Sequence, residues 1–399
     1  MLGLDYILLA LLLVLALPMT CTSIYLLVLT CASRRTIEIG EPGDLFFDVV
    51  VPAHNETAGI ANTISSLRKL EWATDRFRVV VVADNCTDDT ALIASEAGAV
   101  VLERNDEANR GKGYALAHAF HWSRTQGLAD AVVVVDADTE VSVNMLEAFA
   151  IRLNQGECAV QCHYGVLNAG ASWRTRLMAI ALGSIHKLRS RARERLDLSC
   201  GIRGNGWCVT HALLDKLPYR AFSLTEDVEF GVNLGLAGRR VAYCDTAHVN
   251  GEMVTTAAAA RSQRQRWEGG RFELIRSKVP ILLKAAFSDR NAICLDLAID
   301  LLVLPLSYIV LGIAIVCLGA SALLVLKPSS SSPAILLCIG LMDASCIAAY
   351  VFRGWILSGV GPEGFWDLVR VPGFVAWKLV TLVSSPKSRD WIRTKRENS

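Results

Sequence analysis

Long apolar runs lie towards both ends of the chain, and shorter apolar runs alternate with polar segments between them. The long runs cover residues 6–31, 297–326 and 334–352. Each of them is long enough to cross a bilayer, which takes about 20 helical residues. The polar turn of residues 327–333 separates the last two runs. The pattern therefore predicts an N-terminal transmembrane anchor and a later transmembrane hairpin, with a soluble part between them.

Basic residues beside these runs indicate their orientation. Arg34 and Arg35 follow the first run, Arg353 follows the third, and residues 387–396 form a basic tail. Lys and Arg collect on the cytoplasmic side of membrane segments. We therefore expect an integral membrane protein, in the inner membrane if the source is bacterial, with the N-terminus outside and the middle and C-terminus in the cytoplasm. A cleaved signal peptide is disfavoured, because residues 1–5 carry no basic residue and the run is too long.

Two features near the C-terminus leave alternatives open. Residues 365–383 mix aromatic with charged side chains, and Pro372 interrupts them. A broken interfacial helix fits this segment better than a fourth crossing, which stays open. Asp343 falls inside the third apolar run, where a carboxylate is costly. It faces a water path or a partner helix, or else it snorkels or the run ends earlier.

The middle of the chain alternates β-branched runs with helical patterns. Continuous apolar runs such as residues 79–82 are expected for strands that are covered on both faces. The predicted strands are 47–51, 78–83, 99–102, 131–136 and 159–162, and the predicted helices are 58–70, 89–97, 112–126 and 143–154. This order predicts an α/β layer with a mostly parallel sheet, in which ligands bind at the carboxyl ends of the strands.

Composition narrows the classes of function. The 399 residues are 52% hydrophobic with a mean hydropathy of +0.37, which fits a membrane protein. The net charge is +1 and no basic run in the middle outweighs this balance, so we expect no nucleic-acid partner. The twelve cysteines form no CxxC pair, and many lie in apolar runs. They are predicted to be small hydrophobic side chains in a reducing compartment.

Polar residues follow the first two predicted strands and open a later helix. They are Pro52, His54, Asn55 and Glu56 after the first strand, Asp84 after the second, and Lys112 at the helix start. Each alone is typical of a turn or a helix cap. Together at one sheet edge they predict a nucleotide cleft. The Asp84 carboxylate can accept the imide N–H of a uracil, and Lys112 near a helix N-terminus suits phosphate.

Asp136 and Asp138 directly follow the four-valine run of residues 132–135. Two carboxylates at this spacing can share one hard cation through their oxygens. Mg²⁺ or Mn²⁺ would then bridge the two phosphates of a nucleotide-sugar. A solvated loop is the alternative for a bare pair of this kind. After a buried strand in this fold, the metal site is favoured.

Thr225, Glu226 and Asp227 stand at a predicted helix start. Thr225 could cap that helix, with the acids in its first turn. The functional alternative needs a carboxylate that takes a proton from an acceptor hydroxyl, and Asp227 is the candidate base. Direct attack by that hydroxyl would invert the anomeric centre of the sugar.

Gln263, Arg266 and Trp267 share one face of a helix that is predicted to begin near residue 257. Arg266 could pair with diphosphate oxygens, and Trp267 could stack on an acceptor sugar. An amphipathic helix on the membrane surface would show the same residues. The two interpretations are compatible with each other.

In this order, the motifs resemble those of the processive-type family 2 glycosyltransferases, the cellulose, chitin, hyaluronan and poly-N-acetylglucosamine synthases. The resemblance covers roughly residues 46–267 and extends loosely into the membrane segments. It implies a GT-A-like nucleotide-sugar-binding domain flanked by transmembrane helices. It also implies a metal-dependent, inverting transfer from a UDP-sugar to a growing β-linked glycan, with Mg²⁺ or Mn²⁺ as the cofactor.

The resemblance assigns a role to each matching position. Asp84 would contact uracil, Asp136 and Asp138 would hold the diphosphate and the metal, and Asp227 would be the base. The residues expected at the donor diphosphate and the acceptor end are Gln263, Arg266 and Trp267, and those expected in the acceptor-side loop are Gly204, Asn205 and Gly206. The implied partners are a UDP-sugar, a glycan or lipid acceptor, and membrane lipids.

Three predicted transmembrane helices are fewer than polymer-secreting members of that family have. Either the chain works as a homo-oligomer or with a polysaccharide-export partner, or it builds a short glycan or glycolipid without secreting it. The close alternative is therefore a single addition to a lipid acceptor. An inactive scaffold or translocation subunit is disfavoured because Asp136, Asp138, Asp227 and Arg266 are all present. A nucleotidyltransferase is disfavoured by the membrane anchoring.

The predicted organisation has four parts. These are an N-terminal transmembrane anchor (1–35), a cytoplasmic GT-A-like glycosyltransferase domain (36–290), a transmembrane hairpin (291–353), and an interfacial amphipathic segment with a basic cytoplasmic tail (354–399). The identity of the sugar is not contained in any of these motifs.

Overall fold

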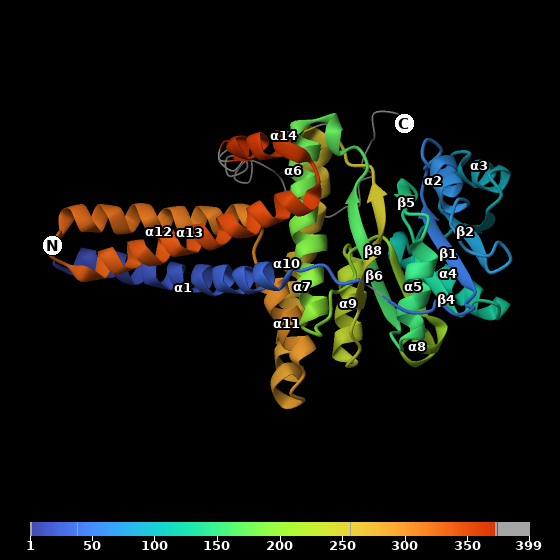
Figure 1. Cartoon of the computed structure of the whole chain (residues 1–399), viewed down its shortest axis with the longest axis horizontal. Helices are drawn as coiled ribbons and strands as arrows, with labels where there is room; N and C mark the ends of the chain where they lie inside the picture. Colours follow the sequence, from blue (N-terminus) through green and yellow to red (C-terminus); the bar gives the residue numbers. More distant parts are fainter. Residues whose placement is uncertain (1, 38, 256, 372, 374–399) are drawn as a thin grey trace.

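The computed structural model describes residues 2–37, 39–255, 257–371 and 373. A long three-helix bundle projects from an α/β part, and further helices run across the junction, roughly perpendicular to the bundle (Figure 1). The bundle is built from α1 (Leu2–Ala32), α12 (Leu306–Leu326) and α13 (Ser331–Ser358). In the described part of the chain, these three helices are long and apolar enough to cross a membrane.

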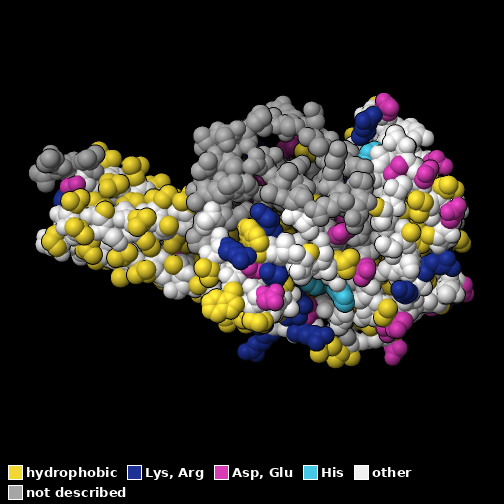
Figure 2. All heavy atoms as spheres, turned by 90° about the horizontal axis from the view of Figure 1, so that it is seen from above, with side chains coloured by type: hydrophobic (Ala, Val, Ile, Leu, Met, Phe, Trp, Pro, Cys, Tyr) yellow, Lys and Arg dark blue, Asp and Glu magenta, His cyan; other side chains and the backbone are white. Residues whose placement is uncertain are grey.

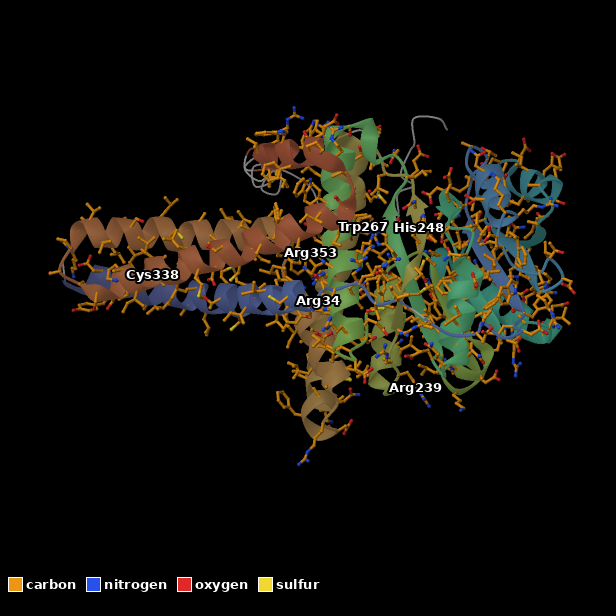
Figure 3. All side chains as sticks on the ribbon, in the orientation of Figure 1. Arg34, Arg239, His248, Trp267, Cys338 and Arg353 are labelled. Atoms are coloured by element: carbon orange, nitrogen blue, oxygen red, sulfur yellow. The ribbon has the colours of Figure 1, made fainter. Side chains whose placement is uncertain are left out.

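The surface of the molecule divides in the same way. Hydrophobic side chains cover the bundle, whereas charged side chains gather on the α/β part (Figure 2). Arg34 and Arg353 lie where the two parts meet, and Cys338 lies far out along the bundle (Figure 3). Arg353 belongs to α13 and donates to the backbone oxygen of Ser33 at 3.2 Å, just beyond α1. The basic residues that flank the apolar runs are thus at one level of the molecule.

Within the bundle, the Asp343 carboxylate faces a partner helix, one of the alternatives left open by the sequence. Asp343 is 1% exposed on α13, and the Thr20 hydroxyl of α1 donates to its Oδ2 at 2.8 Å. A buried carboxylate needs such a donor, because an unpaired one is costly in an apolar setting. All twelve cysteines of the chain are free, as their spacing predicts.

The second apolar run, residues 297–326, does not form a single helix. The chain forms α11 (Ala292–Leu302) and then breaks before α12, whose N-cap is Pro305. Proline has no N–H to donate and disfavours the helical conformation at the residue before it, so the helix ends there. The first part of the run therefore belongs to α11, outside the bundle.

The α/β part contains an eight-stranded sheet with the order β3-β2-β1-β4-β7-β6-β8-β5. Its strands are β1 (Phe47–Ala53), β2 (Phe77–Asp84), β3 (Val100–Arg104), β4 (Ala131–Val134), β5 (Thr139–Val141), β6 (Ala159–Val166), β7 (Trp207–Thr210) and β8 (Ala242–Gly251). The five predicted strands are all present. β5, β7 and β8 were not predicted.

The prediction of a mostly parallel sheet holds for only half of the sheet. β3, β2, β1 and β4 are parallel to one another. β7 is antiparallel to both of its neighbours, β4 and β6, and β5 is antiparallel to β8. β8 returns to run parallel to β6. The sheet is therefore mixed, because strands that the sequence pattern did not reveal enter it in the opposite direction.

Helices cover both faces of the sheet, which explains its continuous valine runs. Val49 and Val51 pack on one face, and Val50 packs on the other. The first face is covered by α2 (Ile60–Leu67), α3 (Thr90–Glu96) and α5 (Met145–Asn154), and the second by α4 (Lys112–Gln126), α8 (His211–Lys216) and α9 (Glu226–Leu236). Strands in a sheet with one exposed face alternate apolar and polar residues. Strands that are buried on both faces lack this alternation and are apolar throughout.

The helices at the junction connect the sheet to the bundle. They are η1 (Ala169–Ala171), α6 (Trp173–Leu182), the π-helix η2 (Gly183–Leu188), α7 (Arg189–Arg195), α10 (Ala257–Ser288), α14 (Gly361–Asp367) and η3 (Leu368–Arg370). η2 lies directly against α13, since a Cβ at Gly354 would be 1.8 Å from Ser184 Oγ. Of the predicted interfacial segment, residue 372 and residues 374–383 lie outside the described residues.

Candidate active site

The carboxyl ends of β1 and β2 bring two polar loops side by side. Asn55 and Asn85, each just past one of these strands, have φ angles of 56° and 51°. Asparagine tolerates this left-handed conformation better than most residues do. The loops are tied together, because the N–H of Thr87 donates to Asn55 Oδ1 at 2.7 Å. His54 Nδ1 lies 2.7 Å from the backbone oxygen of Asp84.

Asp84 is held in one orientation at the end of β2. Its Oδ1 accepts from Arg104 at 2.6 Å and from Asn85 Nδ2 at 3.0 Å, and the residue is 6% exposed. Arg104 ends β3 and also stacks over the Tyr114 ring, 5.7 Å from its centroid. Arg104 was not predicted, because no short motif marks it. The signal that could have revealed Arg104 was a charged residue at the end of the strand next to the one that ends at Asp84.

Lys112 lies at the centre of the cluster. Its Nζ is 2.5 Å from Asp136 Oδ1, 2.6 Å from the backbone oxygen of Gly204 and 3.8 Å from Glu226 Oε1. One ammonium, from the first residue of α4, thus joins the end of β4, the 204–206 loop and the start of α9. Burial opposes its charge, but Asp136 and Glu226 outweigh that effect and raise the pKa of Lys112. Lys112 is therefore cationic across the physiological range.

Asp136 and Asp138 lie in the turn between β4 and β5. The N–H of Asp136 donates to Asn205 Oδ1 at 3.0 Å, and the backbone oxygen of Asp138 accepts from Glu252 at 3.2 Å. The described residues contain no group of three or more His, Cys, Asp or Glu side chains that could enclose a metal. A divalent ion held by one or two carboxylates and completed by substrate phosphates needs no such group. The pair fits that kind of site.

The 204–206 loop is shaped by two glycines in the left-handed region. Gly204 has a φ of +84° and Gly206 a φ of +70°. A Cβ at Gly204 would lie 3.4 Å from Asp227 Oδ2, and one at Gly206 would lie 2.6 Å from Cys162 Sγ. Both positions therefore favour glycine for conformation, and Gly206 requires it for space as well.

Asn205 lies between these two glycines, is fully buried, and holds the loop in place through its hydrogen bonds. Its Nδ2 donates to Thr139 Oγ1 at 2.7 Å, and its backbone oxygen accepts from Gln161 Nε2 at 2.7 Å. Gln161 Oε1 in turn accepts the N–H of Arg203 at 2.8 Å. The predicted contact of this loop with an acceptor stays a prediction, and it would come from the glycine backbone. Gln161 and Thr139 were not predicted, because single polar residues within strands carry no motif.

Thr225 is the N-cap residue of α9, but its side chain does not cap the helix. Its buried hydroxyl has no hydrogen-bond partner among the described residues. The side chain packs instead against Gly270 of α10, where a Cβ would lie 2.6 Å from Thr225 Cγ2. The start of α9 and helix α10 therefore touch.

Glu226 and Asp227 form a carboxylate pair with raised pKa values. Burial is the main cause for both, and the Lys112 ammonium opposes it. The neighbouring Asp227 raises the pKa of Glu226 further, to about 7. Asp227 is the more accessible of the two, since it is half-buried whereas Glu226 is buried. A carboxyl whose pKa is raised and which faces a loop is suited to proton transfer.

Gln263 and Trp267 lie on α10 and are both partly exposed. In Figure 3, Trp267 lies between the bundle and the sheet. Since Gly270 follows less than one turn later, its contact with Thr225 brings this helix face towards the carboxylate pair. The Arg266 side chain lies outside the described residues, so its predicted role stays a prediction.

These elements match a known family of enzymes. The sequence model of the family described as "Glycosyltransferase like family 2" matches residues 42–270, which is more than half of the chain. The chain belongs to this family. Its α/β part has a GT-A-like fold, with a mixed sheet and covering helices.

Curated relatives act on different acceptors. A β-monoglucosyldiacylglycerol synthase from a Nostoc species is 30% identical over 254 residues, which are 62% of this chain and 53% of that relative. A probable glucomannan 4-β-mannosyltransferase from Arabidopsis thaliana is 24% identical over 275 residues, covering 66% of this chain and 49% of the relative. The chain spans about half the length of these relatives.

A solved structure shares the arrangement along most of the chain. It is a mannosyltransferase from Pyrobaculum calidifontis in complex with GDP-Man and Mn²⁺, with a TM-score of 0.58 and 17% sequence identity. The match covers 90% of this chain and 99% of that one. At this identity the likeness shows the fold and leaves the donor of this chain open.

Proposed function

We propose that the chain is an inverting transferase that moves one hexose from a UDP-sugar to a lipid acceptor at the membrane surface. The observation that carries this proposal is the position of Lys112. Its ammonium contacts the donor-side acid Asp136, the Gly204 backbone and, more distantly, Glu226. Donor, acceptor and proton-accepting groups would therefore meet within a few ångströms.

The Asp84 and Arg104 pair supports uracil as the base. Uracil presents a carbonyl, one N–H and a second carbonyl along its edge, whereas guanine presents one carbonyl and two adjacent donors. Arg104 and Asn85 both bind Oδ1 of Asp84, so that oxygen already has its donors. The other carboxylate oxygen of Asp84 would accept a single N–H from the base. The arginine beside it would donate to the adjacent carbonyl of that base. The site matches uracil better than guanine.

In the proposed reaction, the acceptor hydroxyl oxygen forms a bond to the anomeric carbon while the bond from that carbon to the diphosphate oxygen breaks. The electron pair leaves with UDP, and the hydroxyl proton passes to Asp227. Asp227 is the base because it is half-buried and lies beside Gly204, where a Cβ would be 3.4 Å from its Oδ2. Glu226, the other member of the carboxylate pair, would interact with the Lys112 ammonium. Attack from the opposite side of the sugar inverts the anomeric centre.

Asp136 and Asp138 would hold Mg²⁺ or Mn²⁺ together with the donor diphosphate. The ion supplies positive charge to the leaving diphosphate. Lys112 would then turn from Asp136 to the phosphate oxygens, and Pro52, His54, Asn55 and Glu56 would line the nucleotide side.

We expect a chelator to stop transfer, and added Mn²⁺ or Mg²⁺ to restore it, as measured by UDP release. A control in which Ca²⁺, in place of Mg²⁺ or Mn²⁺, is added in excess over the chelator separates simple charge screening from a specific site. Full activity in chelator would contradict the metal assignment of Asp136 and Asp138.

Two observations favour a lipid acceptor. A relative named as a glucosyldiacylglycerol synthase is 30% identical over 254 residues, and the described residues contain three helices that could span a membrane. Elongation of a β-linked glycan is the second candidate, because an Arabidopsis relative named as a probable glucomannan mannosyltransferase is 24% identical over 275 residues. A homo-oligomer or an export partner would be needed only for that second function.

The test uses the purified, detergent-solubilised chain with divalent metal and a panel of UDP-glucose, UDP-N-acetylglucosamine and GDP-mannose. Diacylglycerol is the acceptor, and the products are sized by mass spectrometry. The proposal predicts release from a UDP-sugar and a product with one added hexose. A ladder of products would favour the glycan, and preference for GDP-mannose would contradict the assignment of Asp84 and Arg104.

A further inference from the structure

Helix α11 carries two aspartates into the junction between the α/β part and the bundle. Asp296 is 5% exposed and Asp300 is 6% exposed, one helical turn apart. Buried carboxylates of this kind need cationic partners. Both bind Arg193, and their remaining partners lead to different parts of the molecule.

Asp296 connects to the bundle. Tyr25 of α1 donates to its Oδ1 at 2.8 Å, and Arg193 of α7 donates to its Oδ2 at 2.7 Å. The described contacts of the Asp296 carboxylate therefore fix α1 against α7.

Asp300 connects to the active site. Its Oδ1 binds Arg189 at 3.1 Å and Arg193 at 2.8 Å, while its Oδ2 binds Arg203 at 3.2 Å. Three guanidinium groups thus converge on one carboxylate. Burial alone would raise the pKa of Asp300, but Arg193, Arg203 and Arg189 outweigh it and hold the pKa well below its usual range.

Arg203 carries this contact to the 204–206 loop. It immediately precedes Gly204, its Nε donates to the backbone oxygen of Cys200 at 3.0 Å, and its N–H donates to Gln161 Oε1 at 2.8 Å. Gln161 Nε2 also donates to the backbone oxygen of Asn205 at 2.7 Å. The loop that faces Asp227 is therefore held at its start by a residue that is anchored on Asp300.

The C-terminal end of α11, where Asp300 lies, also holds α10. Arg271 of α10 donates to the backbone oxygens of Asp300 and Val303, the second at 2.7 Å. These carbonyls lack intrahelical partners because the helix stops before Pro305. Arg271 lies one turn after Trp267 and next to Gly270, which touches Thr225. The same turn of α11 thus fixes both the acceptor-side loop and α10.

We propose that Asp300 is a positioning residue for the acceptor side of the reaction, acting through Arg203 on the 204–206 loop. This inference rests on the proposed function. Removing its charge would release the loop and the helix face that define where an acceptor hydroxyl meets Asp227. On the donor side, Asp84 and Arg104 have no described contact with Asp300 or with the 204–206 loop and would be unaffected, whereas Asp136 is bonded to Asn205 in that loop.

The test compares Asp300→Asn with Asp296→Asn, which makes the same chemical change one turn away on the bundle side. Two rates are measured on each purified protein: sugar transfer to the acceptor, and hydrolysis of the donor by water. We expect Asp300→Asn to lower the ratio of transfer to hydrolysis by about tenfold or more, because a small displacement of a reactant costs about that much rate. Asp296→Asn should keep the wild-type ratio. Equal ratios in the two variants would overturn the proposal.

Hydrogen–deuterium exchange provides a readout that needs no activity. Exchange in residues 199–206 should be faster in Asp300→Asn than in wild type or Asp296→Asn, and equal exchange in all three would overturn the proposal. A wild-type protein without turnover of any nucleotide-sugar would contradict the proposed function, whereas the exchange comparison would still decide the role of Asp300.

Arg203 provides a second route if Asp300→Asn does not fold. Its side chain is 11% exposed and it contributes less to the buried cluster than Arg193 does, which is fully buried. Arg203→Met should reproduce the lowered ratio with unchanged UDP binding, and Arg203→Lys should recover part of it. A wild-type ratio in Arg203→Met would overturn the proposal.

Discussion

At the scale of single residues, the site depends on how one cation is shared among carboxylates. Lys112 contacts Asp136 and lies 3.8 Å from Glu226, and it lowers the pKa of Glu226 and Asp227 against the effect of burial. The sequence placed Lys112, Asp136 and Asp227 at element ends, which was enough to predict that they meet. It did not reveal Arg104 or Gln161, because their roles come from strands that become neighbours only in the folded sheet.

The raised pKa values predict a pH dependence. A base must be deprotonated to act; burial raises the pKa of Asp227, and the neighbouring Glu226 retains a proton up to about pH 7. The ratio kcat/KM should therefore rise with pH and level off above neutrality. Lys112→Met removes the charge that favours deprotonation, so the rise should move to higher pH.

The measurement is kcat/KM for the donor from about pH 5.5 to about pH 9, the range over which a neutral pKa is resolved. Lys216→Met, on exposed α8, serves as the control and should keep the wild-type profile. A Lys112→Met profile that rises at lower pH than wild type would contradict the described electrostatics.

At the scale of elements, close packing of helices and loops determines where the reacting groups lie. The sequence predicted α4 with its observed bounds and the core strands of the parallel half. It missed β7, which has four residues, and β8, which lacks a β-branched run. Such strands are recognisable mainly from their partners, because β propensity depends on context. It also missed the break at Pro305, since apolar residues continue on both sides of it.

The contact between α10 and α9 predicts an effect of Gly270→Ala. The added methyl would approach within 2.6 Å of Thr225 Cγ2 and push α10 away from the carboxylate pair. Alanine is favoured over glycine inside a helix by about 1 kcal/mol, so the variant should fold. We expect it to reduce transfer while leaving UDP binding intact.

Gly269→Ala is the matched control, because a Cβ at Gly269 meets nothing within 4 Å. It should keep the wild-type rate. Thr225→Ser in the Gly270→Ala background removes the clashing methyl and should restore part of the activity, as measured by product formation. Equal rates in the two glycine variants would show that this contact is unimportant.

At the scale of the whole molecule, the three apolar helices form one projecting bundle and the α/β part lies at its end (Figure 1). Arg34 and Arg353 mark the level where they meet (Figure 3). The three long helices of the bundle could be predicted from the sequence, because the apolar runs that form them are longer and more apolar than core helices. It could not predict the buried arginine and aspartate cluster, since its members come from segments up to 111 residues apart.

This arrangement predicts that the turn between α12 and α13 and the α/β part lie on opposite sides of the membrane. In intact cells, a membrane-impermeant thiol reagent should label a cysteine introduced at Ser329, but not one introduced at exposed Lys216. Both should be labelled after permeabilisation. The reverse pattern would contradict the proposed orientation.

The central claim is that the cluster around Lys112 transfers sugar with Asp227 as the base. The most direct test measures product formation and UDP binding in parallel, for wild type and for Asp227→Asn. The account predicts that transfer falls by about a hundredfold or more, the usual contribution of a general base, while UDP binds as in wild type. Wild-type transfer by Asp227→Asn would contradict it.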